Sequence, residues 1–170
     1  DSIAFGTGLF FNENAYAAVP VKASLTRSLY SNTPPAASLK MFCPVPLNQG
    51  QYGTCVGWAC SNARTILYAQ KNKLMRLDEV EANRFSPGFI YRLIKPNEIG
   101  CMQGSYIEDA VELLKNSGIP PYRDLKALCP STIQQDHFDE AYKFVIDDYT
   151  RLFSSTALNQ IKKKKKKKSI

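Results

Sequence analysis

The stretch NQGQYGTCVGWA, residues 48–59, joins a polar loop to a long apolar segment. Two glycines in the loop permit tight turns that other residues resist, and Thr54 is a residue type that caps the start of a helix. We therefore expect a buried helix that begins at Cys55 and runs to about Ala69. Its core-facing side is predicted from apolar residues that recur with helical spacing, namely Val56, Ala59, Cys60, Ala63, Ile66 and Leu67.

Cys55 is the candidate reactive residue of this stretch. At a helix N-terminus the backbone N–H groups and the helix dipole stabilise negative charge, which favours a thiolate. Gln49 lies six residues earlier in the loop, and its side-chain amide is suited to donate a hydrogen bond to an oxyanion. The competing interpretation is that Cys55 is a small buried apolar residue without chemistry.

The order of these residues resembles the papain-like cysteine peptidases, whose signature is a Gln-Gly loop running into a Gly-Ser-Cys helix start. The residues that match it in order are Gln49, Gly50, Gly53, Thr54 and Cys55. Downstream, residues 85–87 (FSP) look like the Leu-Ser-Pro helix start of that family. Residues 100–104 (GCMQG) resemble its Gly-Cys-x-Gly-Gly loop, and the whole resemblance covers roughly residues 39–121.

The resemblance implies a fold and a set of roles. The expected fold is α+β, a papain-like cysteine proteinase fold in which this chain supplies mainly the helical subdomain with an incomplete β subdomain. Cys55 is then the nucleophile, and Gln49 supplies the oxyanion-hole side chain. Gln103 and Gly104 are the expected substrate-binding residues. The Gly-Thr-Cys-Val-Gly-Trp-Ala variant looks more like bacterial members of the C1 family than like papain itself.

Three positions depart from the family pattern. Tyr52 stands where papain has a loop cysteine, so the usual partner of Cys101 is missing. Val56 replaces the tryptophan that commonly follows the nucleophile. Gln103 replaces the first glycine of the substrate loop, which changes the expected shape of the substrate subsites.

The chain has a single histidine, His137, in the polar stretch QQDHFDE. A papain-type thiolate needs a histidine as proton carrier and an Asn or Asp to orient it, and in papain-like enzymes these follow the nucleophile by about 130–150 residues. His137 follows Cys55 by only 82 residues, so we interpret it as a surface or capping residue. We therefore expect the chain to be inactive on its own.

Composition and helix signals divide the chain into four parts. Residues 1–38 are expected to form an extended N-terminal arm over the domain or, alternatively, a propeptide-like segment near the cleft. Residues 39–140 form the helical subdomain with the nucleophile helix, residues 141–161 begin the β subdomain, and residues 162–170 are a lysine-rich tail. Partial alternation from 141 to 152 favours a strand, and Ser154 or Ser155 is expected to cap a last helix.

Two further helices carry start and stop signals. Ser86 followed by Pro87 is a favoured helix start, and Pro96 is expected to end that helix. Ser105 with Glu108 predicts a capping box at the start of the next helix.

Charge and hydropathy exclude several function classes. The net charge is +7, but seven lysines lie at 162–168, and the other 15 Lys and Arg balance 15 Asp and Glu. The body of the chain therefore lacks the basic face typical of nucleic-acid binding. No run of 18 apolar residues predicts a transmembrane segment. The expected partners are a peptide or protein substrate and a protein docked on the N-terminal arm, and we expect no nucleic acid, cofactor or metal.

Five cysteines leave the disulfide pairing open. Cys60 is expected to be a reduced core residue, and Cys43, Cys101 and Cys129 can form at most one bridge. A bridge and a chain that starts at Asp1 favour an extracytoplasmic location, whether periplasmic, cell-surface or secreted.

Two function hypotheses follow from these residues. The first is a hydrolase, a cysteine peptidase (thiol protease) that cleaves peptide bonds through the Cys55 thiolate, with the histidine and asparagine supplied from elsewhere. The second is a non-catalytic peptide-binding or accessory subunit of a larger assembly, such as one in the cell envelope.

Overall fold

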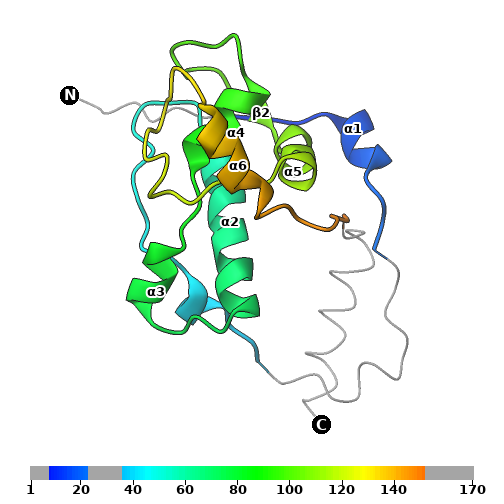
Figure 1. Cartoon of the computed structure of the whole chain (residues 1–170). Coiled ribbons are helices and arrows are strands. Elements are labelled where there is room, and N and C mark those ends of the chain that lie inside the picture. Colours follow the sequence, from blue (N-terminus) through cyan, green and yellow to red (C-terminus); the bar gives the residue numbers. More distant parts are fainter. Residues whose placement is uncertain (1–7, 23–35, 152–170) are drawn as a thin grey trace, which may run out of the picture.

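A central helix organises the protein. The computed structural model describes residues 8–22 and 36–151. Its elements are β1 Leu9–Phe10, α1 Glu13–Ala18, η2 Lys40–Phe42, α2 Cys55–Lys71, α3 Leu77–Ala82, α4 Pro87–Ile94, β2 Ser105–Tyr106, α5 Ile107–Asn116 and α6 Gln135–Tyr142. In Figure 1, α2 runs through the molecule, with α4, α5 and α6 gathered near one end and α3 at the other. The most extensive packing is that of α2 on α4.

α2 begins at Cys55, as the sequence predicted, and Thr54 is its N-cap residue. The Thr54 side chain, however, makes no capping hydrogen bond. The predicted core-facing side is partly wrong, because Ala59, Ala63 and Leu67 are exposed. The prediction of a helix is therefore confirmed, while the prediction of which residues face the core is only partly correct.

The buried side of α2 mixes apolar and hydroxyl residues. It carries Val56, Gly57, Trp58, Cys60, Ser61, Thr65 and Ala69. The Ser61 hydroxyl donates to the Trp58 carbonyl (3.1 Å), and the Thr65 hydroxyl donates to the Ser61 carbonyl (2.8 Å). Hydroxyls that are satisfied within the helix can face a core at little cost. For this reason, the spacing of apolar residues alone does not correctly predict which side of α2 is buried.

α4 approaches α2 closely at Gly57. A Cβ on Gly57 would lie 2.6 Å from the Pro87 carbonyl oxygen. The start of α4 is as predicted, because the Ser86 Oγ accepts a hydrogen bond from the Phe89 N–H (3.4 Å) and Pro87 is the first helical residue. Gly57 thus allows the two helices to meet two residues after Cys55.

Gly57→Ala is expected to destabilise the protein by about 1–3 kcal/mol, because the added methyl group must push α4 away from α2. Helix propensity alone predicts the opposite sign, a gain of about 1 kcal/mol. Chemical denaturation measures the difference. Gly100→Ala is the matched control, since its Cβ would meet nothing closer than 3.5 Å. A more stable Gly57→Ala protein would contradict this packing.

α5 begins later than the sequence predicted. Ser105 lies in β2, Tyr106 is the N-cap residue without a side-chain capping bond, and the predicted capping box of Ser105 with Glu108 is therefore wrong. The Ser105 N–H instead donates to the Gly8 carbonyl (2.7 Å). A long-range backbone contact has thus drawn Ser105 out of the helix start.

The core lies between α2, α4, α5 and α6. The buried Phe85 ring meets Tyr68 and Phe144 edge-on at centroid distances of 5.6 and 5.1 Å. Phe89 of α4 meets Phe138 of α6 in the same way at 5.6 Å, and such edge-to-face pairs add to the stabilisation from burial. The other buried core residues are Val56, Cys60, Ile90, Ala110, Leu114, Ile119, Leu125 and Ala141.

The N-terminal arm is not extended throughout its described part. β1 pairs in parallel with β2, and α1 follows, where the Asn12 side chain accepts a hydrogen bond from the Ala15 N–H (3.0 Å). Residues 13–18 form a helix because this side chain caps the first turn.

The strand expected over residues 141–152 is also wrong as far as residue 151, where the description ends. α6 runs to Tyr142, and the only bridge in residues 141–151 joins Arg151 to Val21. Phe144, in the turn that follows α6, and Ile146, beyond that turn, both pack against the core. The helix expected after Ser154 or Ser155 and the lysines at 162–168 lie outside the described residues. Among the helices of the described residues, none is both long and apolar enough to cross a membrane.

Candidate active site

Cys55 is a free, partly exposed thiol at the first position of α2. Its side chain packs on one side against the hydrophobic core. The first N–H groups of a helix have no partner within the helix, so they can donate to negative charge that develops beside the first residue. The Trp58 N–H closes the first turn by donating to the Thr54 carbonyl (3.1 Å).

The loop before α2 is held by its own side chains. The Gln49 Nε2 donates to the Tyr52 carbonyl (2.9 Å), and the Asn48 side chain accepts a hydrogen bond from the Gly50 N–H (2.7 Å). Gly50 has a φ of +68°, a conformation that favours glycine. The Gln49 amide is thus fixed to the loop that leads into Cys55.

The loop before α2 and the loop of residues 100–104 are brought together. The Gly53 N–H donates to the Cys101 carbonyl (2.7 Å). A Cβ on Gly53 would lie only 2.6 Å from the Gln103 carbonyl oxygen. Gly104 is buried next to this contact, whereas the Gln103 residue is exposed. The two segments that carry the predicted site residues are therefore in direct contact.

Tyr91 and Arg92 of α4 support the 100–104 loop, and sequence reasoning missed both. The Tyr91 hydroxyl donates to the Gln103 carbonyl (2.7 Å). Burial and the neighbouring Glu98 carboxylate raise the pKa of Tyr91, so the hydroxyl keeps the proton that it donates. The buried Arg92 guanidinium donates to the carbonyls of Glu98 (2.9 Å) and Pro130 (2.6 Å). The sequence signal that could have identified Arg92 is its position as a charged residue in the otherwise apolar helix PGFIYRLI.

A disulfide joins Cys101 to Cys129, with Cα atoms 5.8 Å apart. It selects one of the pairs that the sequence left open, and it ties the 100–104 loop to the segment that precedes Pro130. Cys43 and Cys60 are free. Cys60 is a reduced core residue, as predicted, and burial raises the pKa of its thiol to about 11.

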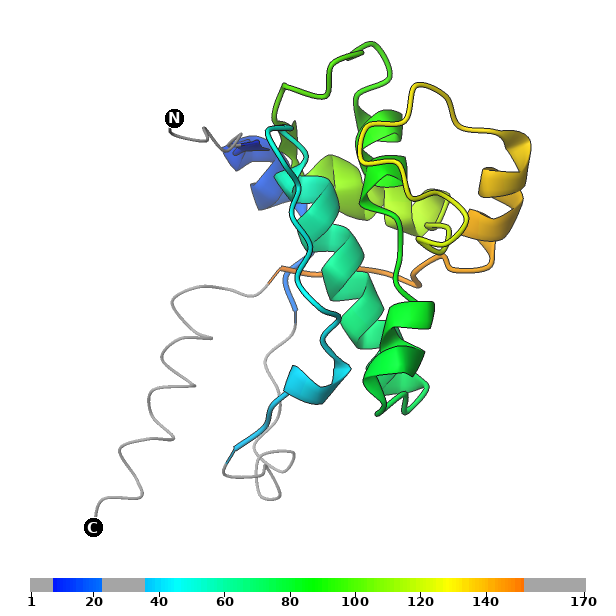
Figure 2. The same ribbon diagram turned by 90° about the vertical axis from the view of Figure 1, so that its left-hand side faces the viewer.

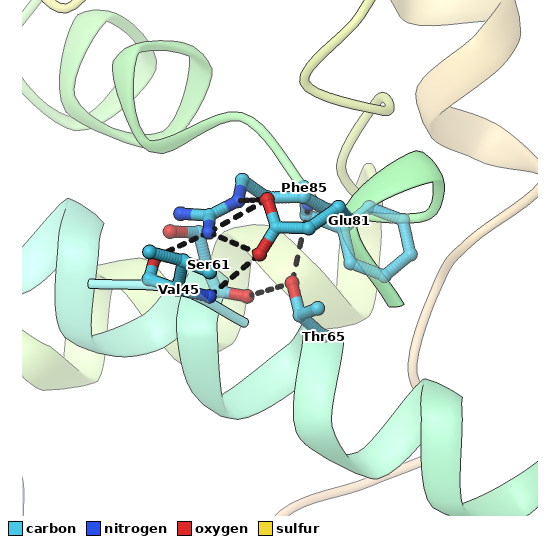
Figure 3. A network of polar contacts seen from close by, with 6 residues as sticks. Val45, Ser61, Thr65, Glu81 and Phe85 are labelled. Carbon is cyan, nitrogen blue, oxygen red and sulfur yellow. Dashed lines mark hydrogen bonds and ion pairs between the residues drawn. The ribbon is translucent and has the colours of Figure 1, made fainter. Parts of the chain in front are cut away.

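An ion pair between the buried Arg84 and the partly exposed Glu81 anchors the segment that leads to the loop before α2 (Figure 3). Arg84 has a side chain that is 2% exposed, pairs with Glu81 at 2.8 Å and also donates to the Val45 carbonyl. The Val45 N–H donates to the same carboxylate (2.6 Å). Next to this pair, the Phe85 N–H donates to the Thr65 hydroxyl of α2 (3.2 Å). These bonds connect the chain at Val45 with α3 and α2.

The Glu81 carboxylate is held in its charged form. Burial works to raise its pKa, but the hydrogen bonds from Arg84 and Val45 act in the other direction, and the pKa lies below its ordinary value.

His137 has a capping role, which is one of the two roles, surface or capping, that the sequence left open. Its Nδ1 accepts a hydrogen bond from the Gln134 N–H (3.0 Å) at the start of α6. In Figure 2, α4 lies between α2 and α6. The hollow beside His137 is lined also by Arg123, Asp124, Asp136, Asp139 and Glu140. Within residues 8–22 and 36–151, no three His, Cys, Asp or Glu side chains converge as metal ligands would.

A central helix that begins with a cysteine, a glutamine-bearing loop before it and a glycine-containing loop after α4 define the helical subdomain of a papain-like cysteine proteinase fold. Among solved structures, the chain is similar to xylellain, a cysteine protease from Xylella fastidiosa, with a TM-score of 0.51 and 18% sequence identity. The match covers 87% of this chain and 54% of xylellain, so the chain spans about half the length of that protease. No protein-family model and no curated protein matches the sequence.

The fold is therefore established, and the roles of individual residues stay predictions. These are the roles of Cys55 as nucleophile, of Gln49 in an oxyanion hole, and of Gln103 and Gly104 in substrate binding.

Proposed function

We propose that the chain is the cysteine-bearing half of a papain-like peptidase of the C1 family, bacterial type, which hydrolyses peptide bonds through Cys55. The observation that carries the proposal is the position of Cys55, a partly exposed free thiol at the first residue of the central helix. The hydrogen bond from Gly53 to the Cys101 carbonyl adds support, because it joins the proposed nucleophile loop to the proposed substrate loop.

In the proposed reaction, the Cys55 Sγ attacks the carbonyl carbon of the scissile peptide bond. A C–S bond forms, and the carbonyl electron pair moves to the oxygen, where the Cys55 N–H and the Gln49 amide are suited to donate to it. The carbonyl re-forms as the C–N bond breaks, which happens only if the departing amine receives a proton. Water then hydrolyses the resulting thioester, so that the C–S bond breaks and Cys55 is released. The histidine that delivers this proton, and the asparagine that orients it, are proposed to come from sequence outside this chain or from another chain.

The proposed substrate is an extended peptide that lies along Gln103 and Gly104. We also propose that residues 39–140 work as the helical subdomain, residues 1–38 as the arm, residues 141–161 as the beginning of the β subdomain, and residues 162–170 as a tail. An extracytoplasmic or secreted location is supported by the Cys101–Cys129 disulfide, because such bonds persist in oxidising compartments.

Alkylation by a peptidyl epoxide at pH 7, mapped by mass spectrometry, tests the proposal within one molecule. Cys55 is expected to react faster than Cys43, which is free and also partly exposed. Cys60 is expected to react slowest, because burial raises the pKa of its thiol to about 11. If Cys55 reacts no faster than Cys43 or than free cysteine, the peptidase proposal fails.

The second candidate function is a non-catalytic peptide-binding or accessory subunit of a larger assembly. The observation that favours it is the pairing of β1 with β2, because an extended backbone lies next to Gly104. Native mass spectrometry of the protein purified from its source distinguishes the two. A monomer without a partner that binds no peptide would contradict the accessory role.

A further inference from the structure

The disulfide between Cys101 and Cys129 has two unlike ends. Cys101 is fully buried, whereas Cys129 is partly exposed. The Cys129 Sγ lies 3.5 Å from the carbonyl oxygen of Ile99, a residue that is 86% exposed. Access decides which sulfur of a disulfide a dissolved thiolate attacks, so the sulfur of Cys129 is the accessible target.

A buried positive charge lies beside the other sulfur. The Arg92 Nη2 lies 3.8 Å from the Cys101 Sγ, and Arg92 is only 6% exposed. The remaining partners of the guanidinium are the neutral carbonyls of Pro96 (3.2 Å), Glu98 (2.9 Å) and Pro130 (2.6 Å). Within the described part of the chain, no ion pair includes Arg92. A buried charge without a counter-charge favours an anion next to it, and a thiolate on Cys101 would be that anion.

These two observations favour the same direction of thiol exchange. The attacked sulfur keeps the incoming thiol, while the other sulfur departs as a thiolate, and a stabilised thiolate departs faster. Cys129 is the accessible end and Cys101 is the end beside the guanidinium. Attack at Cys129 with departure of Cys101 is therefore the favoured course.

The departing end also holds the 100–104 loop against the loop before α2. The Cys101 carbonyl accepts the Gly53 N–H (2.7 Å). The φ of Cys101 is +53°, a left-handed conformation that residues other than glycine adopt rarely. Such a conformation persists only where surrounding contacts hold it. Because the disulfide is one of these contacts, its loss is expected to loosen the bond between Cys101 and Gly53.

We propose that the Cys101–Cys129 disulfide is a site of reversible exchange with dithiols, and that its reduction releases the 100–104 loop from Gly53. One thiolate of the dithiol attacks the Cys129 Sγ, so that a mixed disulfide forms and the electron pair of the broken S–S bond leaves on the Cys101 Sγ. The second thiolate then attacks the dithiol's own sulfur in that mixed disulfide. Cys129 departs as a thiolate that takes a proton from water, and the dithiol is oxidised to a disulfide as the protein gains two electrons.

The effect on function rests on the proposed substrate-binding role of Gln103 and Gly104, but the exchange itself requires no chemistry at Cys55. A released loop no longer presents these two residues beside Gly53. All measurements are therefore made in a Cys55→Ala background. The peptidase proposal fails on the alkylation of Cys55 instead, so the two failures are distinguishable.

Glutathione, which carries a single thiol, tests which sulfur is attacked. After exposure to glutathione, the protein is quenched in acidic denaturant, alkylated with N-ethylmaleimide and mapped by mass spectrometry. Glutathione is expected on Cys129 and the alkyl group on Cys101. Glutathione on Cys101, or equally on both, would overturn the direction of exchange, and a disulfide that stays intact in the folded protein under dithiothreitol would overturn the site.

Hydrogen exchange of the Gly53 amide tests the release of the loop. Reduction by dithiothreitol is expected to accelerate this exchange at least about tenfold, because the amide loses its acceptor. Cys129→Ser is the control, since it lacks the disulfide and is expected to exchange fast with or without dithiothreitol. Unchanged exchange after full reduction, or a response to dithiothreitol that persists in Cys129→Ser, would overturn the release.

Arg92→Met tests the role of the buried charge. The rate of reduction by dithiothreitol is expected to fall at least about threefold, and Arg92→Lys, which keeps the charge, is expected to recover part of that rate. Arg76→Met is the matched control, because Arg76 pairs with Asp78 at an exposed site, and it is expected to leave the rate unchanged. An unchanged or higher rate in Arg92→Met would overturn the role of the guanidinium. If Arg92→Met does not fold, the glutathione map decides the direction of exchange by itself.

Discussion

The purified 170-residue chain is expected to hydrolyse peptides no faster than its Cys55→Ala variant. Attack by a thiolate forms an adduct that collapses backwards unless the amine leaving group is protonated. General acid–base assistance contributes about 10²–10⁴-fold to such reactions, and loss of a triad member removes most of the covalent route. His137 is the single histidine of the chain, and its Nδ1 accepts the Gln134 N–H at the start of α6.

A panel of fluorogenic peptides measures this turnover, with His137→Ala as a second variant. His137→Ala is expected to lower the stability of α6 by about 1 kcal/mol through loss of the capping bond, without changing turnover. Turnover that disappears in Cys55→Ala would show that the chain carries its own proton donor. Turnover that disappears in both variants would identify His137 as that donor and contradict its purely capping role.

Replacing Glu81 by leucine is expected to lower the free energy of unfolding by about 3 kcal/mol, because the buried Arg84 guanidinium is left without its charged partner. For a protein of this size that corresponds to a fall in Tm of about 6–12 °C. Asp78→Asn in the same helix is the control. Asp78 pairs with Arg76 where both side chains are more than half exposed, so its loss is expected to cost less than about 1 kcal/mol.

The stabilisation by Glu81 is expected to depend on pH. Because its folded-state pKa lies below the ordinary value, the stabilisation is fully present above the unfolded pKa of about 4.3. It is lost as pH falls through the lower folded-state pKa. Unfolding measured from pH 7 to pH 3 is expected to show the difference between Glu81→Leu and the original chain shrinking with acid. A difference that stays constant, or one below about 0.5 kcal/mol at pH 7, would contradict the role of the pair.

Local signals predicted the elements that position the proposed nucleophile. The helix start at Cys55 and the start of α4 at Ser86 and Pro87 were predicted from residues within one helical turn. Such signals lie in consecutive residues, as at α4, where the Ser86 side chain accepts the Phe89 N–H of its own helix. At α2 the predicted start is correct although the Thr54 side chain makes no capping hydrogen bond. For His137 the sequence left a surface or a capping role open, and the structure shows the capping role. The failure at Ser105 has a physical cause, since the Gly8 carbonyl accepts the Ser105 N–H from almost a hundred residues away.

The candidate site likewise contains some residues that the sequence indicated and others that only the folded structure identifies. The sequence indicated Cys55, Gln49, Gln103 and Gly104 by their order and chemistry. It did not indicate Tyr91, Arg92 or Gly8, whose importance arises from what folding places beside them. A tyrosine hydroxyl or a glycine carries no site signal by itself until a loop carbonyl lies within hydrogen-bonding or collision distance.

By itself, the sequence determined that a helix begins at Cys55, that a glutamine loop precedes it, and that the fold is papain-like in its helical subdomain. Tertiary structure alone decided which side of α2 is buried, that Cys101 pairs with Cys129, and that the N-terminal arm lies against Ser105. The physical reason is the range of the interactions. Helix starts depend on neighbours three or four residues apart, whereas disulfides, strand pairing and the choice of buried side depend on segments that only the folded chain brings together.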